Sequence, residues 1–471
     1  MEDLFGHLAV AVLILWGLIL VSMVIRRSTP FLRDIFMPAS LLAGFLALLA
    51  GPQVLGLAVR TWVGEDSALS QGLFPEWVRE VWDPLPGLLI SVVFAALFLG
   101  KPIHGIGKMW RDAGPQVMLG HSLAWGQYVV GLALVLLVLG PIWGLPPEAG
   151  ALLEISFVGG HGTVAGMSGA FEEMGFPEGE ALGMGLATLG ILAGAIIGTV
   201  LVNWAVRTQR IDFSAPSPEE KENLANFDER EPQEEQRSSR LVPRDSLSVH
   251  LALLGLAILI GYGLQQGLIW LELNTWGRRE VELFRYIPLF PLAMIGAIVV
   301  QVMVDRLGHT QALNRQLINR ISAGSLDLII AAALATLSLA VLGEYLMPLL
   351  ILGVAAIVWN VAGFLILGPL LIPRDWFQRG SGDFGQSIGM AALGLLLIRL
   401  ADPHDRTRAT ERFGYKQILF EPVLGGGLFT AASVPLIHQL GGWPILIATF
   451  ILTTGFIATG IHLSKDRYAE N

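Results

Sequence analysis

Two glycine-rich stretches of this chain place small polar side chains inside an otherwise apolar sequence. The first is ISFVGGHGTVAGM at 155–167, and the second is GSGDFGQSIGM at 380–390. Side-chain oxygens and the carbonyls of interrupted helices suit a small hard cation such as Na+, whereas the N–H groups that begin a half-helix suit an anion. The two stretches therefore predict one site that binds an anion together with a cation.

The candidate residues fall into two sets. Those that could contact an anionic substrate lie in or next to the two stretches: Gly160, His161, Gly162, Thr163, Gln386, Ser387 and Arg399. Those that could offer oxygen to Na+ are Ser156, Gln127, Asn360, Ser381 and Asp383. Half-helices are expected to begin near Thr163 and near Gln386, with their positive dipole ends toward the membrane midplane.

Purely structural roles compete with these assignments. His161, between two glycines, could only shape the loop, and Thr163 or Gln386 could only cap a helix. Asp383 could belong to a Gly-Asp turn, although an acidic group in an apolar setting is costly unless it is paired or bound to an ion.

Arg399, Gln127 and Asn360 also allow two interpretations. Arg399 could hold a substrate carboxylate with two hydrogen bonds, or it could anchor the cytoplasmic end of its segment beside Asp402. Gln127 and Asn360 lie on the spans that precede the two stretches, where they could coordinate a ligand or tie helices together.

The elements that must position these residues are apolar helices. Of the 471 residues, 53% are hydrophobic and 15% are charged, which is far from the usage of soluble proteins. The predicted membrane spans are 4–25, 35–58, 85–100, 115–140, 182–206, 247–270, 286–304, 325–343, 346–371, 417–440 and 442–463. Segments 150–170 and 380–400 are apolar but interrupted, and we expect them to be re-entrant. The chain is therefore predicted to be an all-α polytopic membrane protein in the lipid bilayer.

The basic residues predict the orientation, because cytoplasmic loops are rich in Lys and Arg. The first loop holds Arg26 and Arg27, whereas the loop at 60–84 is mainly acidic. This alternation places the N-terminus outside and the C-terminus in the cytoplasm. The charged segment at 207–245 is expected to be a flexible cytoplasmic linker.

This topology divides the chain into two inverted five-helix repeats. Residues 1–206 form the first repeat, 207–245 the linker, 246–440 the second repeat, and 441–471 an extra C-terminal span and tail. Each repeat has its re-entrant segment between its fourth and fifth spans. GTVAGM at 162–167 resembles GQSIGM at 385–390, and WGQ at 125–127 resembles WN at 359–360. Inverted repeats of this kind are common in secondary transporters.

Several other classes of protein lack support in the sequence. The chain has no cysteine and no P-loop, so a thiolate site and ATP-driven transport are not expected. Asp383-Phe384-Gly385 matches a kinase motif, but the other kinase motifs are missing. We expect neither an enzyme nor a nucleic-acid partner, and no organic cofactor.

Three longer stretches resemble the bacterial sodium/glutamate symporter family: FVGGHGTVAGMSGAFEEMGFPEGEALGMGLATLG, GDFGQSIGMAALGLLLIRLADP and LFEPVLGGGLFTAASVPLI. Asn203-Trp204 adds to the resemblance, which extends from about residue 35 to 440. It implies Na+-coupled uptake of L-glutamate, with aspartate or analogues as further substrates, across a bacterial inner membrane. It also implies a homodimer and an elevator-type motion. One departure is Asp383, where the family often has Glu.

Two functions therefore remain open on the sequence. The first is Na+-coupled symport of L-glutamate by alternating access. The second is cation exchange, or transport of another small organic anion, by a protein of the same inverted architecture. Opposed half-helix N-termini favour the first function, because a pure cation exchanger has little use for anion-binding elements.

Overall fold

The computed structural model describes residues 2–34, 37–101, 106–211, 247–277, 282–308 and 313–469, and the regular elements in these ranges are all helical. The elements before residue 212 are α1 (Glu2–Ser28), α2 (Pro30–Asp34), α3 (Ala39–Leu49), η1 (Pro52–Gly56), α4 (Leu57–Trp62), α5 (Glu76–Trp82), α6 (Leu85–Ala96), α7 (Ile106–Leu134), η2 (Val135–Leu139), α8 (Gly140–Trp143), η3 (Pro147–Ala151), α9 (Leu152–Phe157), α10 (Gly160–Gly166), α11 (Ser168–Glu173) and α12 (Glu178–Arg207). Those from residue 247 onward are α14 (Leu247–Asn274), α15 (Leu289–Arg306), α16 (Arg315–Thr336), α17 (Leu339–Glu344), α18 (Leu346–Leu371), α19 (Trp376–Ala401), α20 (Ala409–Phe420), α21 (Leu428–Leu440) and α22 (Gly442–Ala469). Most of the predicted linker at 207–245 lies outside the described residues.

Within the described ranges, ten helical stretches are long and apolar enough to cross a membrane when each is counted from end to end by length and composition alone. They are Gly6–Ser28, Ala39–Trp62, Gly107–Trp143, Glu178–Arg207, Leu247–Asn274, Leu289–Arg306, Arg315–Thr336, Leu346–Leu371, Trp376–Ala401 and Gly442–Lys465. The prediction of a polytopic helical membrane protein is therefore confirmed.

The structure corrects three of the predicted spans. The segment predicted at 85–100 forms α6, whose 12 residues are too few to cross a bilayer. The span predicted at 325–343 is α16, which begins ten residues earlier in the chain, followed by the separate helix α17. The span predicted at 417–440 is divided into α20 and α21, because the intervening residues include three consecutive glycines at 425–427.

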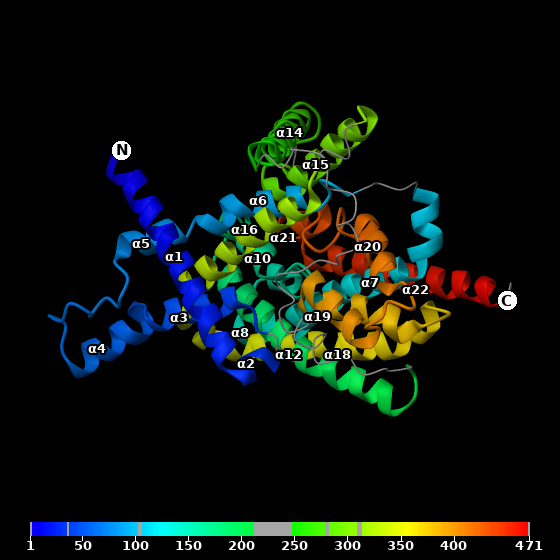
Figure 1. Cartoon of the computed structure of the whole chain (residues 1–471), viewed down its shortest axis with the longest axis horizontal. Helices are drawn as coiled ribbons and strands as arrows, with labels where there is room; N and C mark the ends of the chain where they lie inside the picture. Colours follow the sequence, from blue (N-terminus) through cyan, green and yellow to red (C-terminus); the bar gives the residue numbers. More distant parts are fainter. Residues whose placement is uncertain are drawn as a thin grey trace.

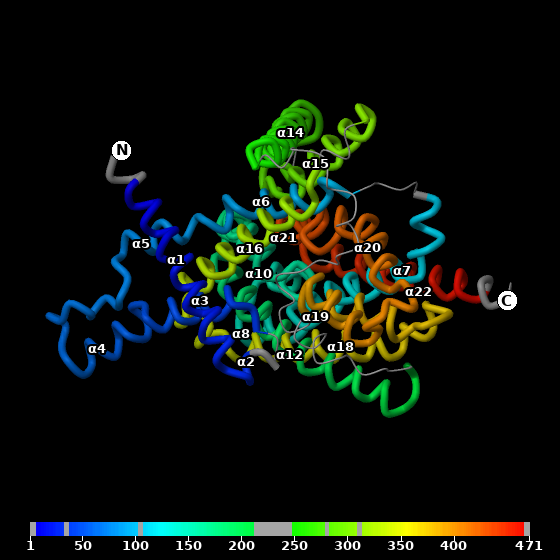
Figure 2. Tube along the Cα trace, viewed as in Figure 1, coloured from blue at the N-terminus to red at the C-terminus, as the bar shows by residue number. Residues whose placement is uncertain are grey.

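The helices pack as two groups, called here the first and the second helix group (Figures 1 and 2). In the first group, α16 lies against α3 and α6, α15 lies against α6 and α14, and α1 packs on α3. In the second group, α7 packs against α18, α20 and α22, and α19 packs against α12 and α18. The short helix α10 contacts α6 and α16 of the first group and α12 of the second. It therefore lies at the seam between the groups.

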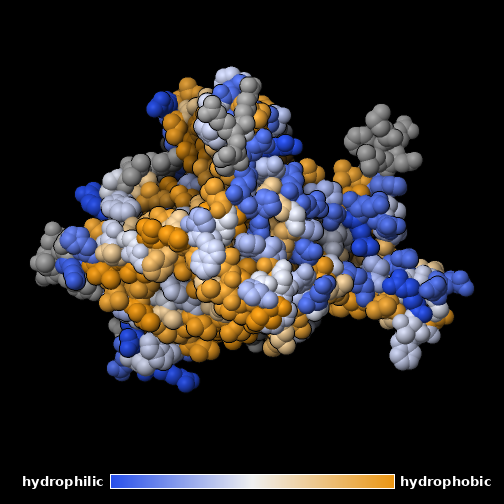
Figure 3. Space-filling model, turned by 180° about the vertical axis from the view of Figure 1, so that it is seen from behind, coloured by the Kyte–Doolittle hydropathy of each residue, from blue (hydrophilic) through white to orange (hydrophobic). Residues whose placement is uncertain are grey.

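The outer helices and the central ones differ in how much of their surface is covered. Only 22% of the apolar window of α1, α14 and α22 is buried, compared with 67% for α19. Leu13, Leu259 and Ile451 are among the exposed apolar side chains of the outer helices. Apolar residues cover much of the face in Figure 3. This is the surface expected of a protein whose outer helices contact lipid.

Candidate functional site

Helix α19 is interrupted at Gly389 (φ −168°, ψ 45°) and Met390 (φ 69°, ψ 167°). The two arms fold back on each other, because a methyl group added to Gly385 would lie 2.6 Å from the Cα of Gly394. A methyl group on Gly382 would likewise lie 2.6 Å from Ile398 Cδ1. Half of this 26-residue helix is about 20 Å long, which is short of the ~30 Å hydrocarbon core of a bilayer. Residues 376–401 are therefore a helical hairpin with its tip at residues 389–390.

The position of this tip corrects the prediction that a half-helix begins near Gln386. Gln386 and Ser387 lie in the last turn before the tip, and the second arm begins after Met390. The reason is that Gly385 is used for close packing of the two arms, whereas Gly389 and Met390 make the turn. Met390 has a positive φ that L side chains rarely adopt, and such a conformation costs about 1–3 kcal/mol.

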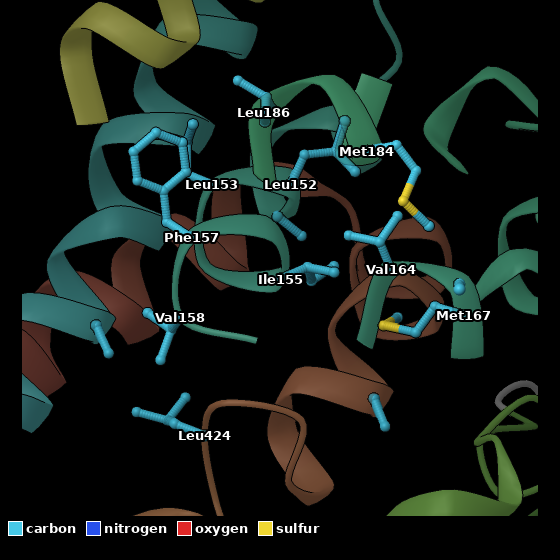
Figure 4. Close-up of a cluster of buried hydrophobic side chains, with 14 of the residues drawn as sticks. Leu152, Leu153, Ile155, Phe157, Val158, Val164, Met167, Met184, Leu186 and Leu424 are labelled. Atoms are coloured by element: carbon cyan, nitrogen blue, oxygen red, sulfur yellow. The ribbon is translucent and has the colours of Figure 1, made fainter. Parts of the chain in front are cut away.

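The first glycine-rich stretch also bends, between α9 and α10. Gly160 has φ +75°, and α10 begins at this residue, three residues before the predicted start near Thr163. A methyl group on Gly160 would lie 3.3 Å from Met390 Sδ, so the bend of the first stretch touches the hairpin tip of the second. The apolar side chains of α9 and α10 pack against α12 and against Leu424, which lies in the segment between α20 and α21 (Figure 4).

Three of the predicted Na+ and substrate residues, Gln127, Asn360 and Ser387, are joined by hydrogen bonds next to the hairpin tip. Gln127 on α7 donates from Nε2 to the carbonyl of Ser387 over 2.6 Å and to Asn360 Oδ1 on α18 over 3.1 Å. Gln127 Oε1 and Asn360 Nδ2 are buried and have no hydrogen-bond partner. The tie between helices is thus present, and it leaves one unpartnered oxygen beside the carbonyl that ends a half-helix.

A buried ion pair, which the sequence did not predict, lies along the first arm of the hairpin. Lys416 Nζ on α20 lies 3.3 Å from Asp383 Oδ1 and also donates to Gln386 Oε1. The ammonium group lies 3.6 Å from the centroid of the Phe420 ring, which adds a cation–π contact. Gly120 on α7 leaves room for the pair, since a methyl group there would lie 2.5 Å from Lys416 Cε.

Glu154 on α9 is a second buried group that the sequence did not single out. Its carboxylate accepts hydrogen bonds from the Tyr128 hydroxyl at 2.7 Å, the Gly425 N–H at 2.7 Å and the Thr430 hydroxyl at 3.1 Å. Glu154 therefore joins the first glycine-rich stretch to the glycine segment between α20 and α21. That segment also reaches the bend, since a methyl group on Gly426 would lie 2.9 Å from Thr163 Oγ1.

The remaining candidates have simpler local contacts. His161 Nε2 lies 2.9 Å from the hydroxyl of Thr188 on α12, whereas Thr163 donates to the carbonyl of Gly159 over 3.0 Å. Ser381 donates to the carbonyl of Gln378 over 2.8 Å within its own helix. Ser156 Oγ is buried with no hydrogen-bond partner.

Arg399 and Gly162 lie in different parts of the structure: Arg399 is at the far end of the hairpin, and Gly162 is on α10. Arg399 is in the last turn of α19, about 13 Å along the second arm from Met390. A methyl group on Gly162 would lie 3.3 Å from Leu326 Cδ1 on α16, so Gly162 faces the seam between the helix groups. Asp402 accepts hydrogen bonds from the backbone of Arg406 and Thr407, so it closes the loop that follows α19.

Taken together, two broken helical segments that touch at their tips, and buried polar groups around them, define the class of a multi-pass membrane transporter. Residues 85–371 match the model of a protein family described as sodium/glutamate symporter. The chain belongs to this family, and its membership suggests Na+-coupled glutamate transport by a transporter rather than an enzyme. A search of curated proteins gives no match. The hairpin at 376–401 lies beyond the matched range.

Proposed function

We propose that this protein takes up L-glutamate into the cell together with Na+, by alternating access around the meeting point of the two broken segments. The observation that carries the proposal is the contact between Gly160 and Met390, combined with the family match. Broken helices whose ends meet within the protein are where secondary transporters bind substrate and coupling ion. Aspartate and close analogues are further substrates of this proposal.

The Na+ site in this proposal uses oxygens at the end of the first hairpin arm. Gln127 Oε1 is a buried oxygen without a hydrogen bond, and the carbonyl of Ser387 lies within hydrogen-bonding distance of the same side chain. A half-helix C-terminal end of this kind supplies carbonyl oxygen to Na+. The other proposed ligands are Asn360, Ser156, Ser381 and Asp383. Among them, Asp383 already has a cationic partner in Lys416, so Na+ must share or displace that partner.

The substrate contacts in this proposal lie at the bend between α9 and α10 and just before the hairpin tip of α19. They are Gly160, His161, Gly162, Thr163, Gln386 and Ser387. Positive φ at Gly160 and Met390 directs the following backbone N–H groups away from a regular helical ladder, which makes them available to an anion. Arg399 is assigned here to the base of the second arm as a helix-end anchor.

We also propose that both broken segments are re-entrant and belong to inverted repeats at 1–206 and 246–440, joined by the linker at 207–245 and followed by the span and tail at 441–471. Two observations support this arrangement. The arms of α19 fold back instead of continuing, and the matched motifs of the two halves touch, since a methyl group on Gly126 would overlap the ring of Trp359.

The motion, assembly and orientation complete the proposal. The second helix group carries the hairpin and would move against the first group in an elevator-type cycle, within a homodimer in a bacterial inner membrane. The N-terminus lies outside, and the linker and C-terminus are cytoplasmic. Helix α10 contacts both groups, so such a movement would change its contacts with α6 and α16 or with α12.

The test is uptake of labelled L-glutamate into vesicles that contain the purified full-length protein. An inward Na+ gradient should drive accumulation that unlabelled glutamate competes, and replacing Na+ by K+ should abolish it. Accumulation that follows a pH gradient without Na+ would contradict the choice of coupling ion. No accumulation by folded protein would direct the search to other anions and to cation exchange.

A further inference from the structure

The buried carboxylates of Glu154 and Asp383 differ in how the protein satisfies them. Glu154 accepts three hydrogen bonds, from one backbone N–H and two hydroxyl groups. Asp383 is also fully buried, but its ion-pair partner is the ammonium group of Lys416, 3.3 Å from Oδ1. Among the described residues, Asp383 Oδ2 has no hydrogen-bond partner. Buried polar atoms are normally satisfied, so this oxygen indicates a ligand, and a carboxylate oxygen suits Na+.

The Lys416 ammonium group is held by contacts at its tip. It donates to Gln386 Oε1, lies near Asp383 Oδ1 and lies 3.6 Å from the centroid of the Phe420 ring. The 3.3 Å separation from Asp383 is longer than the roughly 2.7–2.9 Å of a well-formed charge-assisted hydrogen bond. The lysine stem is flexible, so the ammonium group can leave Asp383 while α20 stays in place. Asp383 is therefore neutralised by a group that another cation can replace.

An ammonium group displaced from Asp383 would keep a negatively charged neighbour. Glu421, at the end of α20, interacts electrostatically with Lys416. Its carboxylate is 8% exposed and accepts a hydrogen bond from Gln417 Nε2 over 2.6 Å. Lys416 thus has two acidic neighbours, of which only Asp383 belongs to the hairpin. A cation at Asp383 would leave the ammonium group with Glu421 as its counter-charge.

We propose that Lys416 is a tethered substitute for Na+: its ammonium group neutralises Asp383 in the Na+-free protein, and Na+ displaces it from Asp383 when ion and substrate bind. The proposal rests on the proposed function and deepens it. A buried carboxylate without a counter-charge is costly within a membrane. With Lys416 in place, the empty second helix group can return across the membrane with a neutral pair instead of an unpaired carboxylate.

Gln386 connects this exchange to the proposed substrate site. It lies in the last turn before the hairpin tip and accepts a hydrogen bond from Lys416. A methyl group on Gly425 would lie 3.8 Å from Gln386 Nε2, and the Gly425 N–H donates to Glu154. Displacement of Lys416 would release Gln386 Oε1, which belongs to a residue proposed to contact glutamate. Na+ binding at Asp383 would therefore change the substrate site directly.

The first experiment measures binding of radioactive Na+ to purified full-length protein by scintillation proximity, with choline as the replacing cation. Lys416→Gln removes the positive charge and keeps an amide that can donate to Gln386. The half-saturating Na+ concentration should be about tenfold lower than in wild type, because Na+ no longer competes with the ammonium group. Lys465→Met, which changes an exposed lysine on α22, is the control and should bind Na+ as wild type does.

Two results of this experiment would overturn the proposal. One is a folded Lys416→Gln protein with wild-type affinity for Na+. The other is a Lys416→Gln protein that fails to fold even in saturating Na+, because an ion that takes the place of the ammonium group should also compensate for its loss.

The second experiment separates the return of the empty protein from the passage of the loaded one. Vesicles with equal Na+ on both sides and unlabelled glutamate inside report exchange, whereas an inward Na+ gradient without internal glutamate reports net uptake. Lys416→Gln should keep exchange within about threefold of wild type and lose net uptake by tenfold or more, because only net uptake requires the Na+-free return.

These measurements distinguish failure of this inference from failure of the proposed function. Wild type that neither accumulates nor exchanges glutamate would reject the symporter, whereas the Na+ affinities of wild type and Lys416→Gln would still decide whether ammonium and Na+ compete. Wild type that accumulates glutamate, together with a Lys416→Gln protein that loses exchange and net uptake equally, would retain the symporter and reject Lys416 as a substitute for Na+.

Discussion

Lys416 Nζ lies 3.3 Å from Asp383 Oδ1, and neither side chain has any exposed surface. The pair joins α20 to the first arm of the hairpin. Each residue offsets part of the cost of burying the other, because removing one partner of a buried ion pair leaves a poorly compensated charge. The acidic group proposed to help bind Na+ is thus already neutralised by a side chain of the protein itself.

The first prediction concerns this pair. Asp383→Asn leaves the Lys416 ammonium buried without its counter-charge, and we expect it to destabilise the protein by about 3–5 kcal/mol. The double variant Asp383→Asn/Lys416→Met should recover much of this loss. Thermal unfolding in detergent, followed by size-exclusion chromatography, measures both effects. If the single and double variants unfold at the same temperature, the two residues are not coupled.

The strained backbone at Met390 gives the second prediction. Met390→Gly and Met390→Ala both remove the side chain beyond Cβ, but only glycine accepts a φ of 69° without steric cost. Met390→Gly should therefore be more stable than Met390→Ala by about 1 kcal/mol. Equal melting temperatures would show that the tip relaxes to another conformation when its side chain is shortened.

Gln127 gives the third prediction. Gln127→Leu removes two hydrogen bonds and leaves the Ser387 carbonyl and Asn360 Oδ1 without this donor, which should cost about 1–3 kcal/mol. The Na+ concentration for half-maximal uptake should rise as well, because Gln127 Oε1 is a proposed ligand. Gln266→Leu, an exposed glutamine on α14, is the control and should change neither quantity. Normal Na+ dependence in stable Gln127→Leu would remove Gln127 from the cation site.

Glu154 gives the fourth prediction. Glu154→Ala removes the acceptor for Tyr128, Gly425 and Thr430, whereas Glu154→Gln keeps an oxygen that can still accept from Gly425 and Thr430. The alanine variant should therefore lose about 3 kcal/mol and the glutamine variant about 1 kcal/mol. Melting temperatures in detergent order the two variants. The reverse order would mean that Glu154 does not hold the glycine segment.

Arg399 gives the fifth prediction. Because it lies at the base of the second arm, Arg399→Lys should leave the KM for glutamate within about twofold of wild type. Uptake at several glutamate concentrations measures this. An increase of tenfold or more would return Arg399 to the substrate site.

The main features of the fold follow from the sequence because long apolar helices leave a strong periodic and compositional signal. The two breaks were also predictable, since glycines and polar residues are unusual inside apolar segments. The position of the second turn was not, because GQSIGM contains two glycines with different roles. Gly385 packs against Gly394, whereas Gly389 makes the turn, and nothing in the local sequence distinguishes the two glycines.

The buried charges were harder to predict for a different reason. Lys416 lies in ATERFGYKQILF, a sequence whose several charged and polar residues suggest an exposed helix start. Its burial depends on Gly120 and Phe420, and Gly120 lies on a distant part of the chain. Glu154 likewise gains its partners from residues 425 and 430, which no local pattern connects to it. Long-range packing therefore decides which polar residues belong to the site.

The bond between Glu154 and Gly425 spans 271 residues of sequence. Ribosomes add about 5–20 residues per second, so Glu154 is made tens of seconds before this partner exists. During that interval the Glu154 carboxylate lacks its Gly425 and Thr430 donors. The first glycine-rich stretch therefore acquires its full set of hydrogen bonds only after residues 425–430 have been synthesised.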